Sequence, residues 1–125
     1  PWGELLSTRS QYLEAAGCLT DGSVRDVKRI RQMKFPVFAG NIGPLDSKHR
    51  GKLMWYDVPG KIHGVNVNSG DFIFGDVDGV VIVPQQITAE VVEKALQKVR
   101  EENQVRGMLE NGVSLTKAFE EHGIL

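Results

Sequence analysis

The sequence predicts a layered α/β fold. Helical and strand patterns alternate over residues 4–39 in the order helix, strand, helix, strand, as in layered α/β domains. The run at residues 80–83 is apolar on both faces, which is typical of a strand at the centre of a sheet. With 125 residues, 41% hydrophobic and 25% charged, the chain has the size and composition of one globular domain. We therefore expect residues 1–125 to form a single α/β domain.

A helix is predicted over residues 4–16, because apolar residues recur at helical spacing and Gly17 follows as a left-handed cap. The residues expected on its apolar face are Leu5, Leu6, Leu13 and Ala16. The short apolar run 18–20 indicates a buried strand, and Asp21-Gly22 indicates a turn after it.

A second helix is expected to start at Ser23, whose hydroxyl can cap it. Its apolar face would comprise Val24, Val27, Ile30 and Met33. Residues 36–39 then predict another short strand, which completes the alternation.

The second half begins with a loop over residues 40–52, where turn-forming residues are frequent and no period is visible. Turn residues separate three strand candidates, at 53–58, 62–67 and 71–74, from each other and from the central strand 80–83. A long helix is expected over residues 88–106 and a short one from Ser114 to Gly123. The inward residues of the long helix would be Val91, Val92, Ala95, Leu96 and Val99.

Charge and composition exclude several classes of function. A net charge of −1 provides no broad positive field, so nucleic-acid binding is not expected. No apolar run approaches the roughly 20 residues that cross a bilayer, and the lone Cys18 cannot form an internal disulfide. A cytoplasmic protein is therefore expected. Because the chain opens at Pro1 without an initiator Met, we also expect sequence to be missing upstream.

One spacing has chemical meaning. Twenty residues separate Glu4 from Arg25-Asp26, enough for a helix, a strand and a turn to return the chain to the first helix start. Free amides of Leu5 and Leu6 at that helix start would attract a carboxylate, and Arg25 could bind the same group with two prongs. Asp26 is a hard oxygen ligand suited to Mg²⁺ or Mn²⁺. The alternative is that Arg25 and Asp26 form only a capping feature and a surface ion pair.

The same residues resemble a known family. Trp-Gly-Glu-Leu-Leu at 2–6 and Asp-Gly-Ser-Val-Arg-Asp at 21–26 are similar to the acidic-X20-Arg-Asp motif of aldolases for 4-hydroxy-4-methyl-2-oxoglutarate and 4-carboxy-4-hydroxy-2-oxoadipate. The segments 36–39, 65–71 and 75–84 look like later strands and turns of the same RraA-like family, in the same order. The resemblance implies a swivelling β/β/α-type domain without the family's N-terminal part, so the chain is either a fragment or a minimal version that buries its exposed sheet against a partner. It also implies a homo-trimer or hexamer with sites between subunits.

By this resemblance, Asp26 is the direct metal ligand, and Arg25 holds pyruvate and its enolate. Leu5 and Leu6 contribute backbone amides to substrate binding. Glu4 binds the metal, Mg²⁺ or Mn²⁺, through water and takes part in catalysis. Glu101 or Glu102 of a neighbouring subunit, with Glu101 preferred, supplies a further acid that reaches the metal through water.

The function implied is a divalent-metal-dependent retro-aldol lyase, a class II pyruvate aldolase. It would cleave 4-hydroxy-2-oxo acids to pyruvate, with oxaloacetate decarboxylation as a related activity. The alternative is a non-catalytic RraA-type oligomer that binds and regulates a ribonuclease. The Arg25-Asp26 pair favours the enzyme, because the regulators we compare it with do not keep that pair.

Other residues indicate structure rather than chemistry. Cys18 lies in an apolar run, which favours a packed core residue over a nucleophile. Residues 76–79 resemble the start of a calcium loop but lack its later ligands, so a turn between strands is expected. A phosphohistidine carrier with His63 as acceptor rests on fold analogy alone. Trp55 and Tyr56 would line either a subunit interface or the substrate.

Overall fold

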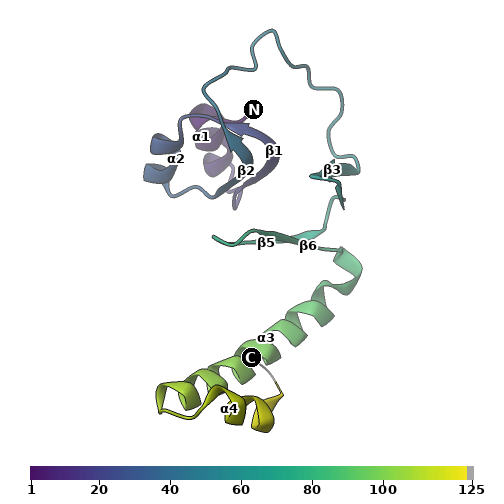
Figure 1. Cartoon of the computed structure of the whole chain (residues 1–125). Coiled ribbons are helices and arrows are strands. Elements are labelled where there is room, and N and C mark those ends of the chain that lie inside the picture. The colour runs from purple at the N-terminus through teal and green to yellow at the C-terminus, as the bar shows by residue number, and fades with distance from the viewer. Residues whose placement is uncertain (124–125) are drawn as a thin grey trace. The chain divides into compact units, whose positions relative to one another are not determined.

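The computed structural model describes residues 1–123. The chain divides into two compact units, Pro1–Ile82 and Val83–Leu125 (Figure 1). The fold is mixed α/β, as predicted. Whether residues 1–125 behave as one domain stays a prediction. Within residues 1–123, no helix is long and apolar enough to span a membrane.

Pairs of strands dominate the first unit. Its elements are α1 (Glu4–Tyr12), β1 (Cys18–Val24), α2 (Val27–Met33), β2 (Val37–Ile42), β3 (Gly60–Ile62), β4 (Val65–Val67), β5 (Phe72–Gly75) and β6 (Val80–Val83), which ends at the boundary. The strands pair as β1-β2, β3-β4 and β5-β6. The second unit contains the short 3-10 helix η1 (Gln85–Ile87), α3 (Thr88–Glu110) and α4 (Leu115–His122).

The parallel pair β1-β2 organises the first unit. Cys18 lies opposite Val37 and Val24 opposite Ile42, and the register shifts between Thr20 and Ser23. The predicted turn at residues 21–22 is therefore wrong. The strand continues through this segment, because the bulge accommodates the extra residues without ending the pairing.

The first helix is shorter than predicted. It ends at Tyr12, and Glu14, with φ 61, adopts the left-handed conformation expected of Gly17. Gly17 has a different role. A Cβ there would lie 2.9 Å from the backbone oxygen of Pro36, so glycine permits the close approach at which Cys18 N donates to that oxygen.

The predicted apolar face of α1 is also wrong for this chain. Leu5, Leu6 and Leu13 are 74%, 52% and 60% exposed, whereas Ser7 is fully buried. Ser7 Oγ accepts from Trp2 Nε1 at 2.8 Å and donates to Gly3 O at 3.0 Å. Hydrogen bonding thus satisfies the polar side chain on the face that packs inward.

The second helix begins later than expected. Ser23 belongs to β1, and the N-cap of α2 is Asp26. Ile30 of α2 is buried, as predicted, together with Val24 and Phe35. Helices α1 and α2 contact one another.

The later strands differ from the predictions in three places. Residues 53–58 form no strand, and the expected strand 62–67 is the antiparallel hairpin β3-β4. Its two-residue turn has positive φ at both His63 and Gly64, as a hairpin turn that matches strand twist requires. β6 lies where predicted but in a two-stranded sheet, with Val81 58% exposed rather than central.

In the second unit α3 and α4 pack together (Figure 1). α3 extends four residues beyond the predicted end, from 106 to 110, and Val92, Leu96 and Val99 on its expected inward face are exposed. α4 agrees with the prediction. Ser114 Oγ accepts from Lys117 N, and Gly123 is its left-handed C-cap.

Candidate functional site

The two sequence segments singled out for their spacing come together through a strand-like contact. Trp2 pairs with Val24 as a parallel bridge, with Trp2 N donating to Ser23 O and Arg25 N donating to Trp2 O. This pairing sets the start of α1 beside the end of β1. The return of the chain predicted for Arg25 and Asp26 is therefore observed.

Asp26 lies at the N-terminus of α1. Its Oδ2 accepts from Glu4 N at 3.2 Å, so a carboxylate satisfies the first helix amide. Ser7 N donates to Gly3 O, whereas the amides of Leu5 and Leu6 have no acceptor within residues 1–123. These two free amides point to a position for a further anion.

Gly3 makes the close approach possible. A Cβ at this position would lie 3.0 Å from Asp26 Oδ2 and 3.1 Å from Arg25 Nε. The backbone of Gly3 is extended, so glycine is required here for space rather than for conformation. Gly3 stands in the Trp-Gly-Glu-Leu-Leu motif, but no local sequence pattern indicates that it leaves room for Arg25 and Asp26.

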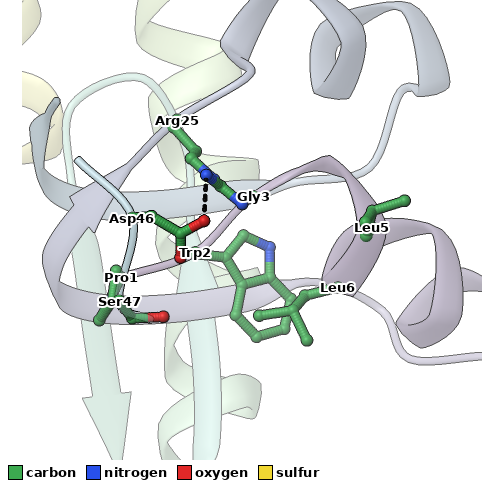
Figure 2. Close-up of a pocket in the computed structure, with 8 residues that line it drawn as sticks. All are labelled: Pro1, Trp2, Gly3, Leu5, Leu6, Arg25, Asp46 and Ser47. Carbon is green, nitrogen blue, oxygen red and sulfur yellow. Dashed lines mark hydrogen bonds and ion pairs between the residues drawn. The ribbon is translucent and has the colours of Figure 1, made fainter. Parts of the chain in front are cut away.

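Arg25 lies between two carboxylates. Its Nε is 3.6 Å from Asp26 Oδ2, and its Nη1 donates to Asp46 Oδ2 at 2.9 Å. Figure 2 shows the side chains of Arg25 and Asp46 pointing toward one another. Arg25 is 36% exposed, so water reaches this network.

Asp46 was missed by the sequence reasoning, which assigned its segment only to a loop. The pKa of Asp46 lies below its ordinary value, first because the backbone N–H of Lys48 donates to its carboxylate, and then because Arg25 hydrogen-bonds and attracts it. The sequence did contain a signal for Asp46. It follows β2 as Arg25 follows β1, and the ends of neighbouring parallel strands lie close together.

These residues surround a small pocket of about 50 Å³ (Figure 2). Its lining is Pro1, Trp2, Gly3, Leu5, Leu6, Arg25, Asp46 and Ser47. The pocket therefore combines the Arg25 guanidinium, the Asp46 carboxylate paired with it, the free amides at the start of α1 and an apolar wall. Such a combination suits a small carboxylate with an apolar or keto neighbour.

Glu4 and Asp26 do not line this pocket but lie together at the start of α1, and they are the residues that could hold a divalent cation. Glu4 Oε1 is 3.4 Å from Thr8 Oγ1 and 4.0 Å from Arg29 Nε, and its side chain is 28% exposed. Asp26 Oδ1 has no partner among residues 1–123. Carboxylate oxygens are the donors Mg²⁺ prefers, and one or two suffice because the ion keeps several waters. Within that described range, no three His, Cys, Asp or Glu side chains cluster as a metal site would.

The remaining candidates belong to other elements of the chain. Glu101 and Glu102 belong to α3 in the second unit, where Gln97 Nε2 donates to Glu101 Oε1 and Lys98 pairs with Glu102. Burial raises the pKa of the Cys18 thiol, which is half-buried rather than part of the buried core. The acidic turn at residues 76–79 is closed by Asp76 N donating to Gly79 O.

The chain is similar to several known proteins. Residues 1–82 match the RraA-like family, described as Aldolase/RraA. Protein DlpA of Legionella pneumophila is 33% identical over 121 residues, which cover 97% of this chain and 20% of that protein. An uncharacterized protein of Methanocaldococcus jannaschii is 35% identical over 116 residues, covering 91% of this chain and 54% of its own length.

The 4-hydroxy-4-methyl-2-oxoglutarate aldolase of Thermus thermophilus is 36% identical over 70 residues, covering 56% of this chain and 42% of the enzyme. Among solved structures, an uncharacterized protein from Pseudomonas syringae superposes with a TM-score of 0.91 at 29% identity. That match covers 94% of this chain and 59% of the other. The chain thus spans less than two thirds of the length of these relatives. Since the family match includes α1, β1 and the segment that carries Asp46, and the fold recurs in a solved relative, the chain belongs to the RraA-like family.

Proposed function

We propose that this chain acts as a divalent-metal-dependent lyase that cleaves 4-hydroxy-2-oxo acids and releases pyruvate, with oxaloacetate decarboxylation as a related activity. The observation that carries the proposal is the convergence of Arg25 and Asp26 on the start of α1, where the Leu5 and Leu6 amides are free of acceptors within residues 1–123. The Thermus thermophilus relative, named as an aldolase for a substrate of this class, supports it.

Both reactions share one difficulty, because breaking the C3–C4 bond leaves an enolate. The amides of Leu5 and Leu6 bind the carboxylate next to the keto group, helped by the positive end of the α1 dipole. Arg25 donates both to this carboxylate and to the 2-keto oxygen, where negative charge develops and where stabilisation lowers the barrier.

Asp26 would hold Mg²⁺ or Mn²⁺ directly, and Glu4 would do so through water. When bound, the cation supplies Lewis-acid polarisation of the 2-keto group. Glu4 accepts the 4-hydroxyl proton through a water molecule, and a water molecule returns a proton to C3 of the enolate, which gives pyruvate. Glu101 of a neighbouring copy would complete the outer ligand set in a homo-trimer or hexamer.

The first test is pyruvate release from 4-hydroxy-4-methyl-2-oxoglutarate. We expect activity with Mg²⁺ or Mn²⁺, loss with EDTA and recovery when the metal is returned. Activity that survives chelation contradicts the metal requirement. A lyase rate at background, together with capture of a ribonuclease, would favour the regulatory alternative.

Two variants separate the assigned roles. Asp26→Asn removes the charge but keeps a residue that tolerates the left-handed conformation, φ 58, observed at Asp26. Metal affinity and turnover should fall together, with the thermal midpoint nearly unchanged. Arg25→Lys keeps the charge but loses the planar fork, so kcat/KM should fall by about 100-fold while metal affinity stays the same. Calorimetric metal titration beside the pyruvate assay measures both quantities. Full activity in Arg25→Lys, or normal Mg²⁺ binding in Asp26→Asn, would show that Arg25 and Asp26 form only a structural ion pair.

A further inference from the structure

We propose that Asp46 is a positioning residue, which holds the Arg25 guanidinium in the orientation that binds a carboxylate in the pocket. The inference deepens the proposed function and rests on it in one respect, that the ligand carries a carboxylate of the pyruvate type.

Asp46 uses its two oxygens for different tasks. Oδ1 accepts from Lys48 N at 3.0 Å, and Oδ2 accepts from Arg25 Nη1 at 2.9 Å. The first bond fixes the rotation of the carboxylate, because it ties that group to its own backbone two residues on. The second bond then transmits this orientation to Arg25.

The guanidinium is held at two of its three nitrogens. Asp46 holds Nη1, and Asp26 Oδ2 lies 3.6 Å from Nε. Nη2 has no partner within residues 1–123. A guanidinium is rigid and planar, so restraining two nitrogens also directs the third, which remains available to a ligand.

The backbone explains why Asp46 reaches the pocket. Gly43 N donates to Val24 O at 3.0 Å, which ties the start of the irregular segment after β2 to the residue before Arg25. Asp46 follows three residues later, and its side chain lines the pocket with that of Arg25. The backbone hydrogen bond from Gly43 to Val24 therefore brings the segment that carries Asp46 close to Arg25.

A positioning role and a purely repulsive role of Asp46 predict opposite changes in carboxylate affinity when Asp46 is removed. If Asp46 orients Arg25, its removal frees a side chain that binding must immobilise again, so the carboxylate binds more weakly. If the Asp46 charge only repels an anion, its removal makes the carboxylate bind more tightly.

Pyruvate titration with Mg²⁺ present decides between them. In a Trp55→Phe background Trp2 is the only tryptophan, so its fluorescence reports on the pocket that it lines. We expect Asp46→Ala to raise the Kd for pyruvate by about 3- to 10-fold. Asp46→Asn should lie between Ala and the wild type, because its amide oxygen still accepts from Arg25. Ser47→Ala is the matched control, since Ser47 lines the same pocket without a side-chain bond to Arg25.

A double-mutant cycle tests whether Asp46 acts through Arg25. In an Arg25→Ala background, Asp46→Ala should leave the Kd unchanged. The inference is overturned if Asp46→Ala binds pyruvate as tightly as the wild type or more tightly, if its effect persists without Arg25, or if the wild type binds no pyruvate.

The lyase assay keeps the two proposals apart. If pyruvate binds and the effects of Asp46 and Arg25 on its Kd are coupled, but no turnover is detected, the lyase proposal fails and the positioning role stands. If Asp46→Ala turns over substrate with wild-type KM and kcat, the positioning role fails and the lyase proposal stands.

Discussion

At the scale of single residues, backbone geometry concentrates charge at one helix start. Asp26, in the left-handed region at φ 58, is the N-cap of α2, yet its carboxylate bonds Glu4 N at the start of α1. A left-handed Asp is tolerated because its short polar side chain can bond locally. One residue thus connects two helices, and the absence of a side chain at Gly3 leaves room for it.

The lowered pKa of Asp46 has a measurable consequence. The backbone N–H of Lys48 is its first cause and Arg25 adds to it. Because the folded-state pKa is depressed, this carboxylate contributes stability above its ordinary pKa of about 3.9, and the contribution is lost as pH falls through the lowered value. Carboxyl ¹³C NMR should therefore give an Asp46 midpoint below that of an ordinary Asp.

Arg25→Ala should raise this midpoint only in part, since the bond from Lys48 remains. A wild-type midpoint at or above the ordinary value would contradict the geometry.

At the scale of elements, the parallel pair β1-β2 carries the site. Its close approach depends on glycine twice. A Cβ at Gly17 would meet the Pro36 oxygen, and one at Gly40 would lie 2.4 Å from the backbone oxygen of Asp21. Neither glycine has positive φ, so both are needed for contact distance rather than for conformation.

Gly40→Ala should therefore destabilise the fold by about 1–3 kcal/mol, the usual cost of overpacking. The strand has to move, because the atom met is backbone and not a flexible side chain. Gly51→Ala is the control, as nothing lies within 4 Å of its Cβ position, and it should stay within about 0.5 kcal/mol of the wild type. Urea unfolding measures both variants. Equal midpoints would show that the β1-β2 contact tolerates a methyl group.

At the scale of the whole molecule, much apolar surface is exposed in the described residues. Within residues 53–58, five large apolar side chains are between 51% and 84% exposed, namely Leu53, Met54, Trp55, Tyr56 and Val58. Contiguous apolar surface of this kind marks interaction sites. Self-association would cover it and would also allow an acid from a neighbouring copy to reach the site.

We therefore expect sedimentation velocity to show a trimer or hexamer, and Trp55→Glu to weaken the association. Val77→Glu is the matched control, because Val77 is fully exposed in a turn outside that segment. A wild-type chain that stays monomeric at all concentrations would contradict the expectation. Equal weakening by both substitutions would show that the segment 53–58 is not the interface.

The sequence by itself determined the α/β class, the positions of β6 and α4, and the approach of Arg25-Asp26 to the start of α1. These follow from local periodicity, capping and the length of chain between two motifs, all of which a linear pattern records. Only the tertiary structure decided that Asp21-Gly22 is part of a bulged strand, that Ser7 rather than Leu5 or Leu6 faces inward, and that Asp46 holds Arg25. The physical reason is common to the three, because each depends on a neighbour distant in sequence. β2 pairs with β1 on both sides of the bulge, and Trp2 donates to the buried hydroxyl of Ser7. The hydrogen bond from Gly43 to Val24 places the segment of Asp46 next to the pocket.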